Sequence, residues 1–448
     1  MTEHAASTAL LTDHYELTML RAALHSGVAG RQSVFEVFAR HLPHGRRYGV
    51  VAGTGRLLDA LAAFRFGEPE LDFVRAAGLA DEATLDFLRS YRFSGDIWGY
   101  AEGECYFPGS PILVVEGTFA EAVILETLVL SVLNHDCAIA SAASRMVTAA
   151  GSRPLIEMGS RRTHEQAAVA SARAAYLAGF ATTSNLRAGQ LYGVPTSGTS
   201  AHSFTLVHDG EKEAFRGQVS ALGAGTTLLV DTYDVAAAVR KAVEVAGPDL
   251  GAVRVDSGDL PVIASQVRLL LDELGARKTR VVLTGDLDEL SIAALAAAPA
   301  DGYGVGTSLV TGSGVPTAAL VYKLVARQGP GGPGAPLQPV AKRSVGKPGR
   351  GGRKWATRVT RRGTAVTELI TTEGPPAEGR GRPLLRPLVR GGEITGAEPL
   401  TAARDRHRAA LAELPPHALS LARGYPALPT VFEPDQPDLL NGESNGES

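Results

Sequence analysis

The sequence predicts an α/β protein whose central part is a parallel barrel with helices outside. From Pro154 onward, a pattern of strand, polar loop and helix repeats without the signals of antiparallel hairpins. Polar residues follow nearly every strand, which suits a ring of loops around one barrel mouth, whereas an open sheet concentrates function at one switch point. The predicted strand ends are PLIEMG (154–159), FATTSN (180–185), VPTSGT (194–199), TTLLVDTYD (226–234), AVRVDSGDL (252–260), RVVLTGDLDE (280–289) and GYGVGTSLV (302–310).

The composition is that of an ordinary globular protein with more than one domain. The 448 residues suffice for two or three domains, and 44% hydrophobic residues with a formal charge of -3 show no bias towards nucleic acid or membrane. Cys105 and Cys137 lie in unrelated contexts, which argues against a disulfide framework or a thiolate zinc site. The N-terminus lacks a signal-peptide pattern and no apolar run approaches ~20 residues, so we expect a cytoplasmic protein without a membrane partner.

Mixed helices and strands are expected on the N-terminal side of the barrel. Asp13 and Glu16 have the spacing of a capping pair that opens a helix over 14–26. Residues 30–115 alternate between helix and strand patterns and indicate an α+β module. The segment 121–136 is apolar on nearly every side, which predicts a helix buried against the next domain.

A basic region follows the last predicted barrel strand. Residues 302–367 contain eleven Lys and Arg but no Asp or Glu. Such a run is most often a solvated face, and nucleic-acid binding is the conventional second interpretation. A third interpretation is that these cations lie near a polyphosphate at the barrel mouth. The NGES repeat at the C-terminus is expected to be disordered and without chemistry.

The loops after the first three predicted strands carry cations, hydroxyls and a histidine. Arg161 and Arg162 follow the first strand, a pair that suits an anionic, phosphorylated ligand. His202 can act as a nucleophile towards a phosphoryl group, although a lone histidine is more often structural. Arg254 lies on the fifth predicted strand, AVRVDSGDL. Taken by itself, an arginine there is more often an ion-paired barrel residue than a ligand contact.

The later loops are acidic or rich in glycine. Carboxylates at neighbouring strand ends can hold a Mg²⁺ ion that bridges phosphate oxygens, whereas a single Asp more often caps a helix or forms an Asx turn. Three acidic loops in succession favour a site; they contain Asp231, Asp234, Asp256, Asp259, Asp286 and Asp288. The glycines of GYGVGTSLV leave backbone N–H groups open to a phosphate, and late barrel loops often bind one.

In combination these motifs resemble the nicotinate phosphoribosyltransferase family. The segments TDHYE, GSRR, SNLRAGQLYGVPTSGTSAHSF, RVDSGDL, DGYGVGTSLV and KRSVGKPG occur in the family's order over roughly residues 10–360. The resemblance implies formation of nicotinate mononucleotide and pyrophosphate from nicotinate and phosphoribosyl pyrophosphate, with coupled ATP hydrolysis, in NAD salvage. It also implies an irregular, type II phosphoribosyltransferase-like barrel with an α+β domain from both chain ends, and a homodimer that does not bind nucleic acid.

The resemblance also implies roles for single residues. His202 matches the histidine that ATP, as co-substrate, phosphorylates, and Thr199 lies in the same motif. Tyr15 matches a position that stacks on nicotinate, and Arg254 one that faces its carboxylate. The other matches are Arg161 and Arg162 near the ribose phosphates, Asp256, Ser257 and Gly258 in the ribose and metal loop, and Gly304, Gly306 and Thr307 around the 5′-phosphate. Catalysis is assigned to His202, Arg161 and Asp256, and Mg²⁺ or Mn²⁺ binding to Asp256 and Asp286.

The expected domains follow from these assignments. An N-terminal α+β domain covers 1–118, the catalytic barrel 119–325, a basic Gly/Pro-rich segment that completes the α+β domain 326–432, and a tail 433–448.

Three alternatives stay open. A nicotinamide- or quinolinate-specific enzyme would use the same chemistry. To bind an amide, however, the site would need a hydrogen-bond acceptor, whereas to bind a carboxylate it would need a cation. An inactive barrel could serve as a binding protein, against which the intact His202, Arg161 and Asp256 argue. An aldolase-type enzyme would need a Schiff-base lysine on a strand, and the predicted strands contain none.

Overall fold

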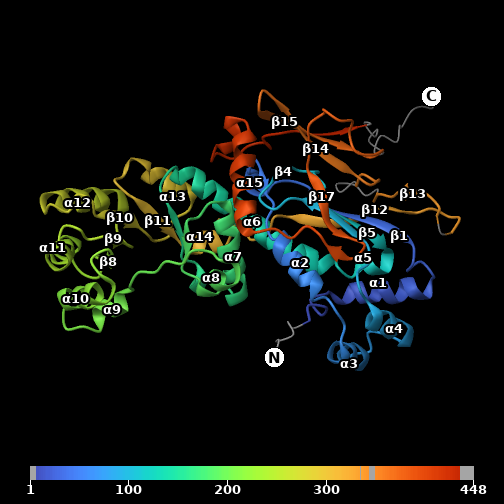
Figure 1. The fold of residues 1–448 in the computed structure, drawn as a ribbon, viewed down its shortest axis with the longest axis horizontal. Coiled ribbons are helices and arrows are strands. Elements are labelled where there is room, and N and C mark those ends of the chain that lie inside the picture. Colours follow the sequence, from blue (N-terminus) through green and yellow to red (C-terminus); the bar gives the residue numbers. More distant parts are fainter. Residues whose placement is uncertain (1–6, 333, 343–348, 434–448) are drawn as a thin grey trace, which may run out of the picture. The chain divides into compact units, whose positions relative to one another are not determined.

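The computed structural model describes residues 7–332, 334–342 and 349–433 (Figure 1). It divides into two compact units. One combines Met1–Cys137 with Thr317–Ser448, and the other consists of Ala138–Pro316. The NGES repeat lies outside the described residues, so its predicted disorder stays a prediction.

The first unit interleaves strands from the two ends of the chain. Within the described residues its larger sheet has seven strands in the order β13-β12-β1-β5-β3-β17-β18, all paired antiparallel. They are β13 Leu337–Pro339, β12 Leu320–Gln328, β1 Gln32–Ala39, β5 Leu113–Thr118, β3 Asp96–Tyr100, β17 Leu385–Arg390 and β18 Glu393–Ile394. Because C-terminal strands pair directly with β1 and β3, the prediction of an α+β domain built from both chain ends is confirmed.

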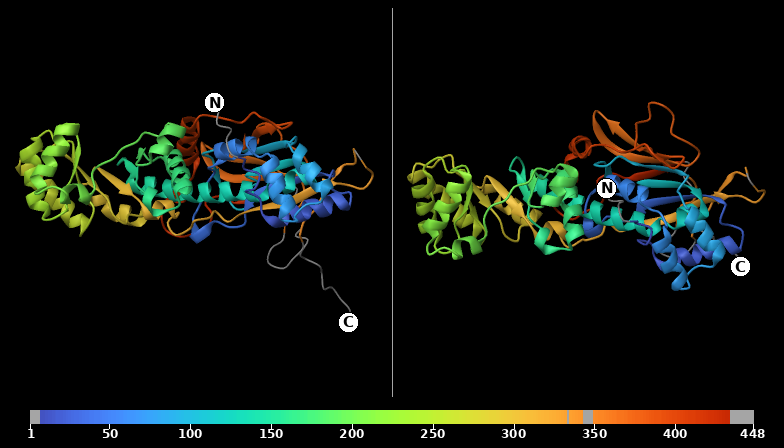
Figure 2. Two further views of the ribbon diagram at one scale, coloured as in Figure 1. Left: turned by 90° about the horizontal axis from the view of Figure 1, so that it is seen from below. Right: turned by 60° about the horizontal axis from the view of Figure 1, so that its bottom comes forward.

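A second sheet of the same unit comes mostly from the C-terminal segment. Its order is β16-β14-β15-β19, and a short pair, β2-β4, stands apart. The bounds are β16 Arg382–Pro383, β14 Trp355–Arg361, β15 Thr364–Thr371, β19 Thr430–Glu433, β2 Gly49–Val50 and β4 Cys105–Tyr106. Both views in Figure 2 show these late strands, orange to red, lying against the early blue and cyan part of the unit. The helices of this unit are α1 His14–His25, α2 Thr54–Ala62, α3 Glu68–Ala76, α4 Glu82–Ser90, α5 Phe119–Val123 and α15 Leu400–Glu413.

The predicted capping pair at the start of α1 is wrong. Asp13 is the N-cap residue, but its side chain makes no capping hydrogen bond. Glu16 instead points inward and is fully buried, where Oε1 accepts hydrogen bonds from the backbone N–H and the hydroxyl of Thr127. Glu16 therefore contacts Thr127, distant in the sequence, although its spacing from Asp13 is typical of a capping box.

A long apolar helical stretch covers residues 119–150. It comprises α5 and α6 (Glu126–Ala150) and, contrary to the expectation from the sequence, is long and apolar enough to cross a membrane. Of its most apolar part, 67% is buried within the fold. Such burial is what the core helix of a globular protein requires, and the predicted burial of 121–136 agrees with it.

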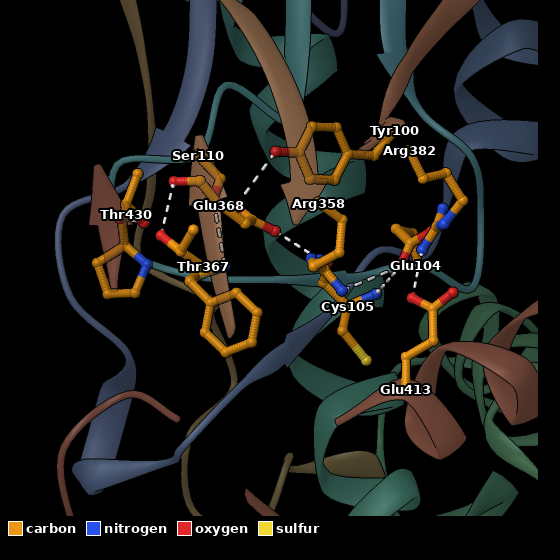
Figure 3. A network of polar contacts seen from close by, with 12 residues as sticks. Tyr100, Glu104, Cys105, Ser110, Arg358, Thr367, Glu368, Arg382, Glu413 and Thr430 are labelled. Carbon is orange, nitrogen blue, oxygen red and sulfur yellow. Dashed lines mark hydrogen bonds and ion pairs between the residues drawn. The ribbon is translucent and has the colours of Figure 1, made fainter. Parts of the chain in front are cut away.

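The basic region supplies internal counter-ions (Figure 3). Arg358 is fully buried between Glu368, to which its Nη2 donates, and Glu104, whose Oε1 lies 3.6 Å from Nη1. Lys354 is 2% exposed and donates to both carboxylate oxygens of Glu36, at 2.9 and 2.8 Å. For these two cations, both the solvated-face and the polyphosphate interpretations are wrong. Arg343 and Lys347 lie outside the described residues.

The second unit carries the parallel sheet. Within the described part of this unit, six strands follow the order β7-β6-β11-β10-β9-β8, and every pairing is parallel. They are β7 Thr182–Thr183, β6 Leu155–Glu157, β11 Gly302–Val305, β10 Arg280–Leu283, β9 Ala252–Val255 and β8 Thr227–Leu229. The predicted strand over 194–199 is reduced to one parallel bridge, Thr183 to Thr196. These six parallel strands form a curled half-barrel, which confirms the predicted irregular α/β barrel.

Helices connect these strands, and α10, α11 and α12 lie along the β8–β10 side of the sheet (Figure 1). The last three connections start on side-chain caps, as the Asx preference predicts. Asp234, Asp259 and Asp288 accept hydrogen bonds from the first-turn N–H groups of α11, α12 and α13. The helices are α7 Glu165–Ala178, α8 Leu186–Tyr192, α9 His202–Leu206, α10 Glu211–Leu222, α11 Val235–Ala246, α12 Leu260–Glu273, α13 Glu289–Ala294 and α14 Thr307–Val310.

Candidate active site

A pocket of about 420 Å³ opens at the carboxyl ends of the parallel strands. This volume lies in the range of small-molecule sites, and the position is where α/β proteins place them. The loops after β6, β7, β9, β10 and β11 line it, together with residues 197–201. Nine of the predicted site residues line it: Arg161, Arg162, Thr199, Arg254, Asp256, Asp286, Gly304, Gly306 and Thr307.

The two adjacent arginines form the cationic wall of the pocket. Arg161 and Arg162 belong to a single 3-10 turn, Ser160–Arg162, and both are exposed. Among the described residues, neither guanidinium has a hydrogen-bond or ion-pair partner. Cations that converge on a pocket without a protein counter-ion are suited to an anionic ligand.

Arg254 differs from this pair because it is held in place. It lies on β9 with 8% of its surface exposed, and Nη1 donates to the Thr199 hydroxyl and to the Ser200 carbonyl, 3.3 Å away. Its Nη2 lies 3.5 Å from Oδ1 of Asp256, while Nε is buried without a partner. Burial lowers the pKa of Arg254 and the neighbouring carboxylates raise it. Arg254 lines the pocket, so these neighbours hold its guanidinium beside any ligand bound there.

The acidic loops separate into two kinds of carboxylate. The second Asp of each loop caps a helix, as described above, which was one of the two interpretations left open by the sequence. The first Asp of each loop stays at the strand end: Asp256 and Asp286 line the pocket, and Asp231 accepts a hydrogen bond from the backbone N–H of Asp256. The helix-cap interpretation is therefore confirmed for the second Asp of each loop, whereas metal binding by the first Asp stays a prediction.

Asp231 belongs to one of the predicted acidic loops but received no role of its own from the sequence, and it organises this part of the site. Its side chain is 2% exposed, and Oδ2 accepts hydrogen bonds from Asp256 N at 3.0 Å and Ser257 Oγ at 2.6 Å. Its Oδ1 has no hydrogen-bond partner and lies 3.9 Å from Nε2 of His202. The alternating positions in VDTYD could have indicated that the first Asp continues the strand and points inward.

His202 is the first residue of α9, next to the pocket-lining Ala201. Its Nδ1 lies 3.1 Å from the Thr232 hydroxyl, and its side chain is 40% exposed. One ring nitrogen is thus oriented by a hydroxyl while the ring stays accessible. Ser257 and Gly258 continue the Asp256 loop, and Gly258 has φ +89°, a conformation that favours glycine.

Two glycines of β11 and its loop, Gly304 and Gly306, line the pocket but differ in how closely the fold packs around them. A Cβ on Gly304 would lie 2.5 Å from the Thr284 methyl and 2.7 Å from the Met158 sulfur, so this position must be glycine. A Cβ on Gly306 would meet its nearest neighbour at 3.5 Å, an ordinary contact distance. Gly306 and Thr307 line the pocket at the start of α14, where backbone N–H groups would suit a phosphate.

Known proteins match most of the chain. Residues 10–134 match the family model of the nicotinate phosphoribosyltransferase N-terminal domain. Nicotinate phosphoribosyltransferase pncB1 of Mycobacterium tuberculosis (strain ATCC 25618 / H37Rv) is 59% identical over 432 residues, which cover 94% of each chain. The chain belongs to the nicotinate phosphoribosyltransferase family. Two further members are pncB2 of the same strain, 40% identical over 92% of this chain and 89% of the relative, and the Bacillus subtilis (strain 168) enzyme, 36% identical over 71% and 67%.

Solved structures support the fold. The crystal structure of human nicotinic acid phosphoribosyltransferase aligns with a TM-score of 0.80 and 24% identity, over 94% of this chain and 97% of that one. The nicotinate-nucleotide pyrophosphorylase of Pyrococcus furiosus gives a TM-score of 0.74 at 24% identity, over 90% and 95%. The irregular barrel of this phosphoribosyltransferase family is therefore confirmed by geometry as well as by sequence.

Tyr15, the predicted nicotinate-stacking residue of this family member, lies in α1 of the first unit. The residue is 45% exposed. Burial of the hydroxyl and the nearby Glu126 raise the pKa of Tyr15 to about 12, so the phenol stays protonated at neutral pH. It is not among the residues that line the pocket of the second unit, and its contact with nicotinate stays a prediction.

The carboxylates fit a metal that is bound jointly with substrate. Across the described residues, no group of three or more His, Cys, Asp or Glu could hold an ion. Asp256 and Asp286 nevertheless line the same pocket, and the Asp286 side chain has no partner in the described part of the chain. Mg²⁺ commonly takes one or two protein carboxylates and completes its shell with water and substrate phosphate. The pair fits that mode of binding.

Proposed function

We propose that the pocket transfers the phosphoribosyl group of phosphoribosyl pyrophosphate to the ring nitrogen of nicotinate. The products are nicotinate mononucleotide and pyrophosphate, an entry step to NAD. The observation that carries the proposal is the pair of unpartnered cations, Arg161 and Arg162, in one pocket with the carboxylates Asp256 and Asp286. Membership of the nicotinate phosphoribosyltransferase family supplies the identity of the acceptor.

The reaction needs charge stabilisation more than a protein nucleophile. The bond between ribose C1 and the pyrophosphate oxygen breaks, its electron pair leaves with pyrophosphate, and the nicotinate nitrogen lone pair forms the new bond to C1. Positive charge develops on the ribose and negative charge on the leaving group, which Arg161 and Arg162 stabilise. Mg²⁺ or Mn²⁺, when held by Asp256 and Asp286, would add positive charge at the phosphate oxygens.

Arg254 is proposed to select the carboxylate of nicotinate. Thr199 and Ser200 fix its guanidinium, so little side-chain entropy is lost when a ligand binds. An amide presents its own N–H donors to this cation, whereas a carboxylate presents only acceptors. The neighbouring Asp256 would repel a carboxylate placed beside it, so the ligand must approach the face of Arg254 that Asp256 leaves free.

His202 is proposed to accept the γ-phosphoryl group of ATP. Its exposed ring, oriented through the Thr232 hydroxyl, is compatible with attack on a phosphoryl group. A phosphohistidine would place negative charge near Asp231, and we propose that the resulting repulsion shifts the loop that Asp231 holds. The glycine cradle of Gly304, Gly306 and Thr307 would hold the 5′-phosphate. By resemblance, the enzyme is expected to be a cytoplasmic homodimer.

Product analysis tests this proposal. The enzyme is incubated with phosphoribosyl pyrophosphate and Mg²⁺ and with nicotinate, nicotinamide or quinolinate, each with and without ATP. Nicotinate mononucleotide is expected only from nicotinate, and faster with ATP. Product from another base would mean that the enzyme is specific for that base. If none of the bases gave product, the enzyme assignment would be overturned. His202→Ala should lose ATP stimulation but retain basal transfer; retained stimulation would contradict the phosphohistidine.

A further inference from the structure

The loop that carries the two arginines is tied to its neighbour by a ring of hydrogen bonds. We call residues 159–162 the arginine loop. Glu157, the last residue of β6, is fully buried; its Oε1 accepts from Gly159 N and its Oε2 from the Thr183 hydroxyl. On the far side, Asn185 N donates to the Thr183 hydroxyl at 2.9 Å and Asn185 Nδ2 donates to Ser160 Oγ at 2.9 Å. The peptide bond between Gly159 and Ser160 completes the ring.

The ring has little freedom to adjust. Gly159 packs so closely against Val310 that a Cβ would overlap the valine side chain. The carbonyl of Glu157 accepts from Ser184 N at 2.8 Å, and Asn185 Oδ1 accepts from Ala188 N at 2.9 Å to cap α8. Glu157 and Asn185 are therefore also held by backbone N–H groups outside the ring, so a change in the ring should alter the position of the arginine loop.

Glu157 is an unusual residue to bury here because no cation neutralises it. Within the described residues it makes no ion pair, and burial raises the pKa of its carboxyl while the two donors lower it. A buried carboxyl without a counter-ion costs stability unless its hydrogen bonds are all made. The nearby arginines do not pair with it, which leaves both guanidinium groups available to the pocket.

We propose that Glu157 and Thr183 are positioning residues that hold the arginine loop in the geometry that binds the diphosphate of the sugar donor. The proposal rests on the proposed function for the identity of that donor. Breaking the ring leaves the guanidinium groups chemically intact but lets their loop sample other positions. Breaking the ring should therefore weaken substrate binding more than it slows the chemical step.

Thr183→Val is the sharpest variant because valine keeps the β-branched shape and removes only the hydroxyl. We expect the KM for phosphoribosyl pyrophosphate to rise about tenfold and kcat to change less than about twofold. The matched control is Thr279→Val: this threonine is 1% exposed and its hydroxyl has no hydrogen-bond partner, so KM should not change. Equal KM values for the two variants would overturn the proposal.

A double-mutant cycle separates positioning from general destabilisation. In a background that lacks both guanidinium groups, Arg161→Ala with Arg162→Ala, Thr183→Val should raise KM by less than about twofold, because its effect passes through the arginine loop. The same cycle is measured by calorimetry with inorganic pyrophosphate as the probe. If loss of both arginines leaves pyrophosphate affinity unchanged, the proposed function of the pocket fails. If loss of both arginines weakens affinity and Thr183→Val does not, only the positioning role fails.

Glu157 itself supplies a second test should Thr183→Val unfold. Glu157→Gln keeps an acceptor for Gly159 N–H and can donate to Thr183, so pyrophosphate affinity should stay within about threefold of the native protein. Glu157→Ala removes both links and should weaken it about tenfold or more. If the glutamine and alanine variants bind equally weakly, the negative charge matters and the hydrogen-bond ring does not carry the effect.

Discussion

Glu16→Gln is predicted to flatten the dependence of stability on pH. Glu16 is fully buried, and among the described residues its Oε2 has no hydrogen-bond partner. Burial, followed by repulsion from Glu126 and Asp13, raises its pKa from 4.5 to about 7, although the donors of Thr127 oppose the shift. The folded state thus binds this proton more tightly than the unfolded chain does.

The sign and size of this pH dependence follow from the difference in proton binding between the folded and the unfolded protein. Between the unfolded pKa near 4.5 and the folded pKa near 7, the folded protein holds more protons, so the free energy of unfolding falls as pH rises. A shift of this size corresponds to about 3 kcal/mol in full, of which roughly 2 to 3 kcal/mol is lost between pH 5 and pH 8. Glutamine resembles the protonated carboxyl at every pH, so the variant lacks this contribution and should exceed the native protein in stability at pH 8.

The assay is urea unfolding followed by circular dichroism at several pH values from 5 to 8. The native protein should lose roughly 2 to 3 kcal/mol more than Glu16→Gln over this range. Glu393→Gln, at an exposed position on β18, controls for the substitution itself and should follow the native curve. Parallel curves for the native protein and Glu16→Gln would refute the reasoning.

Three further predictions concern the site and the buried ion pairs. Gly304→Ala forces a methyl against Thr284, which should cost about 1–3 kcal/mol of unfolding free energy, measured by urea unfolding, and reduce activity. Arg358→Met leaves Glu368 buried without its cation and should cost about 3–5 kcal/mol, seen as a lower urea midpoint at pH 8. Asp231→Asn removes the charge that faces His202 and should lower the ATP stimulation of product formation more than basal transfer. An unchanged midpoint or an unchanged stimulation ratio would contradict the respective argument.

The local pattern of the sequence was sufficient to locate the strand ends of the site. All seven predicted positions reappear, six as strands and one as a bridge within the described residues, because buried parallel strands are short apolar runs that end in polar loops. The loops converge because parallel strands place their carboxyl ends on one edge. That convergence is why Arg161, Asp256 and Gly304, far apart in the chain, line one pocket.

The partners of buried charges could not be predicted in this way. Lys354 pairs with Glu36, 318 residues away, because β1 and the C-terminal segment lie in one unit. Glu157 gave no signal either, since a single carboxylate at a strand end has no distinguishing spacing. Its role depends on Thr183, which approaches it only after β6 and β7 have paired. Long-range pairing, unlike strand or helix formation, leaves no local pattern in the chain.

The most direct test of the account is a crystal structure of the protein with phosphoribosyl pyrophosphate and Mg²⁺. The account predicts that the diphosphate lies in the pocket of the second unit, in contact with Arg161 or Arg162, with the metal on Asp256 or Asp286. A diphosphate bound away from both arginines would contradict the central claim, even in an enzyme that makes nicotinate mononucleotide.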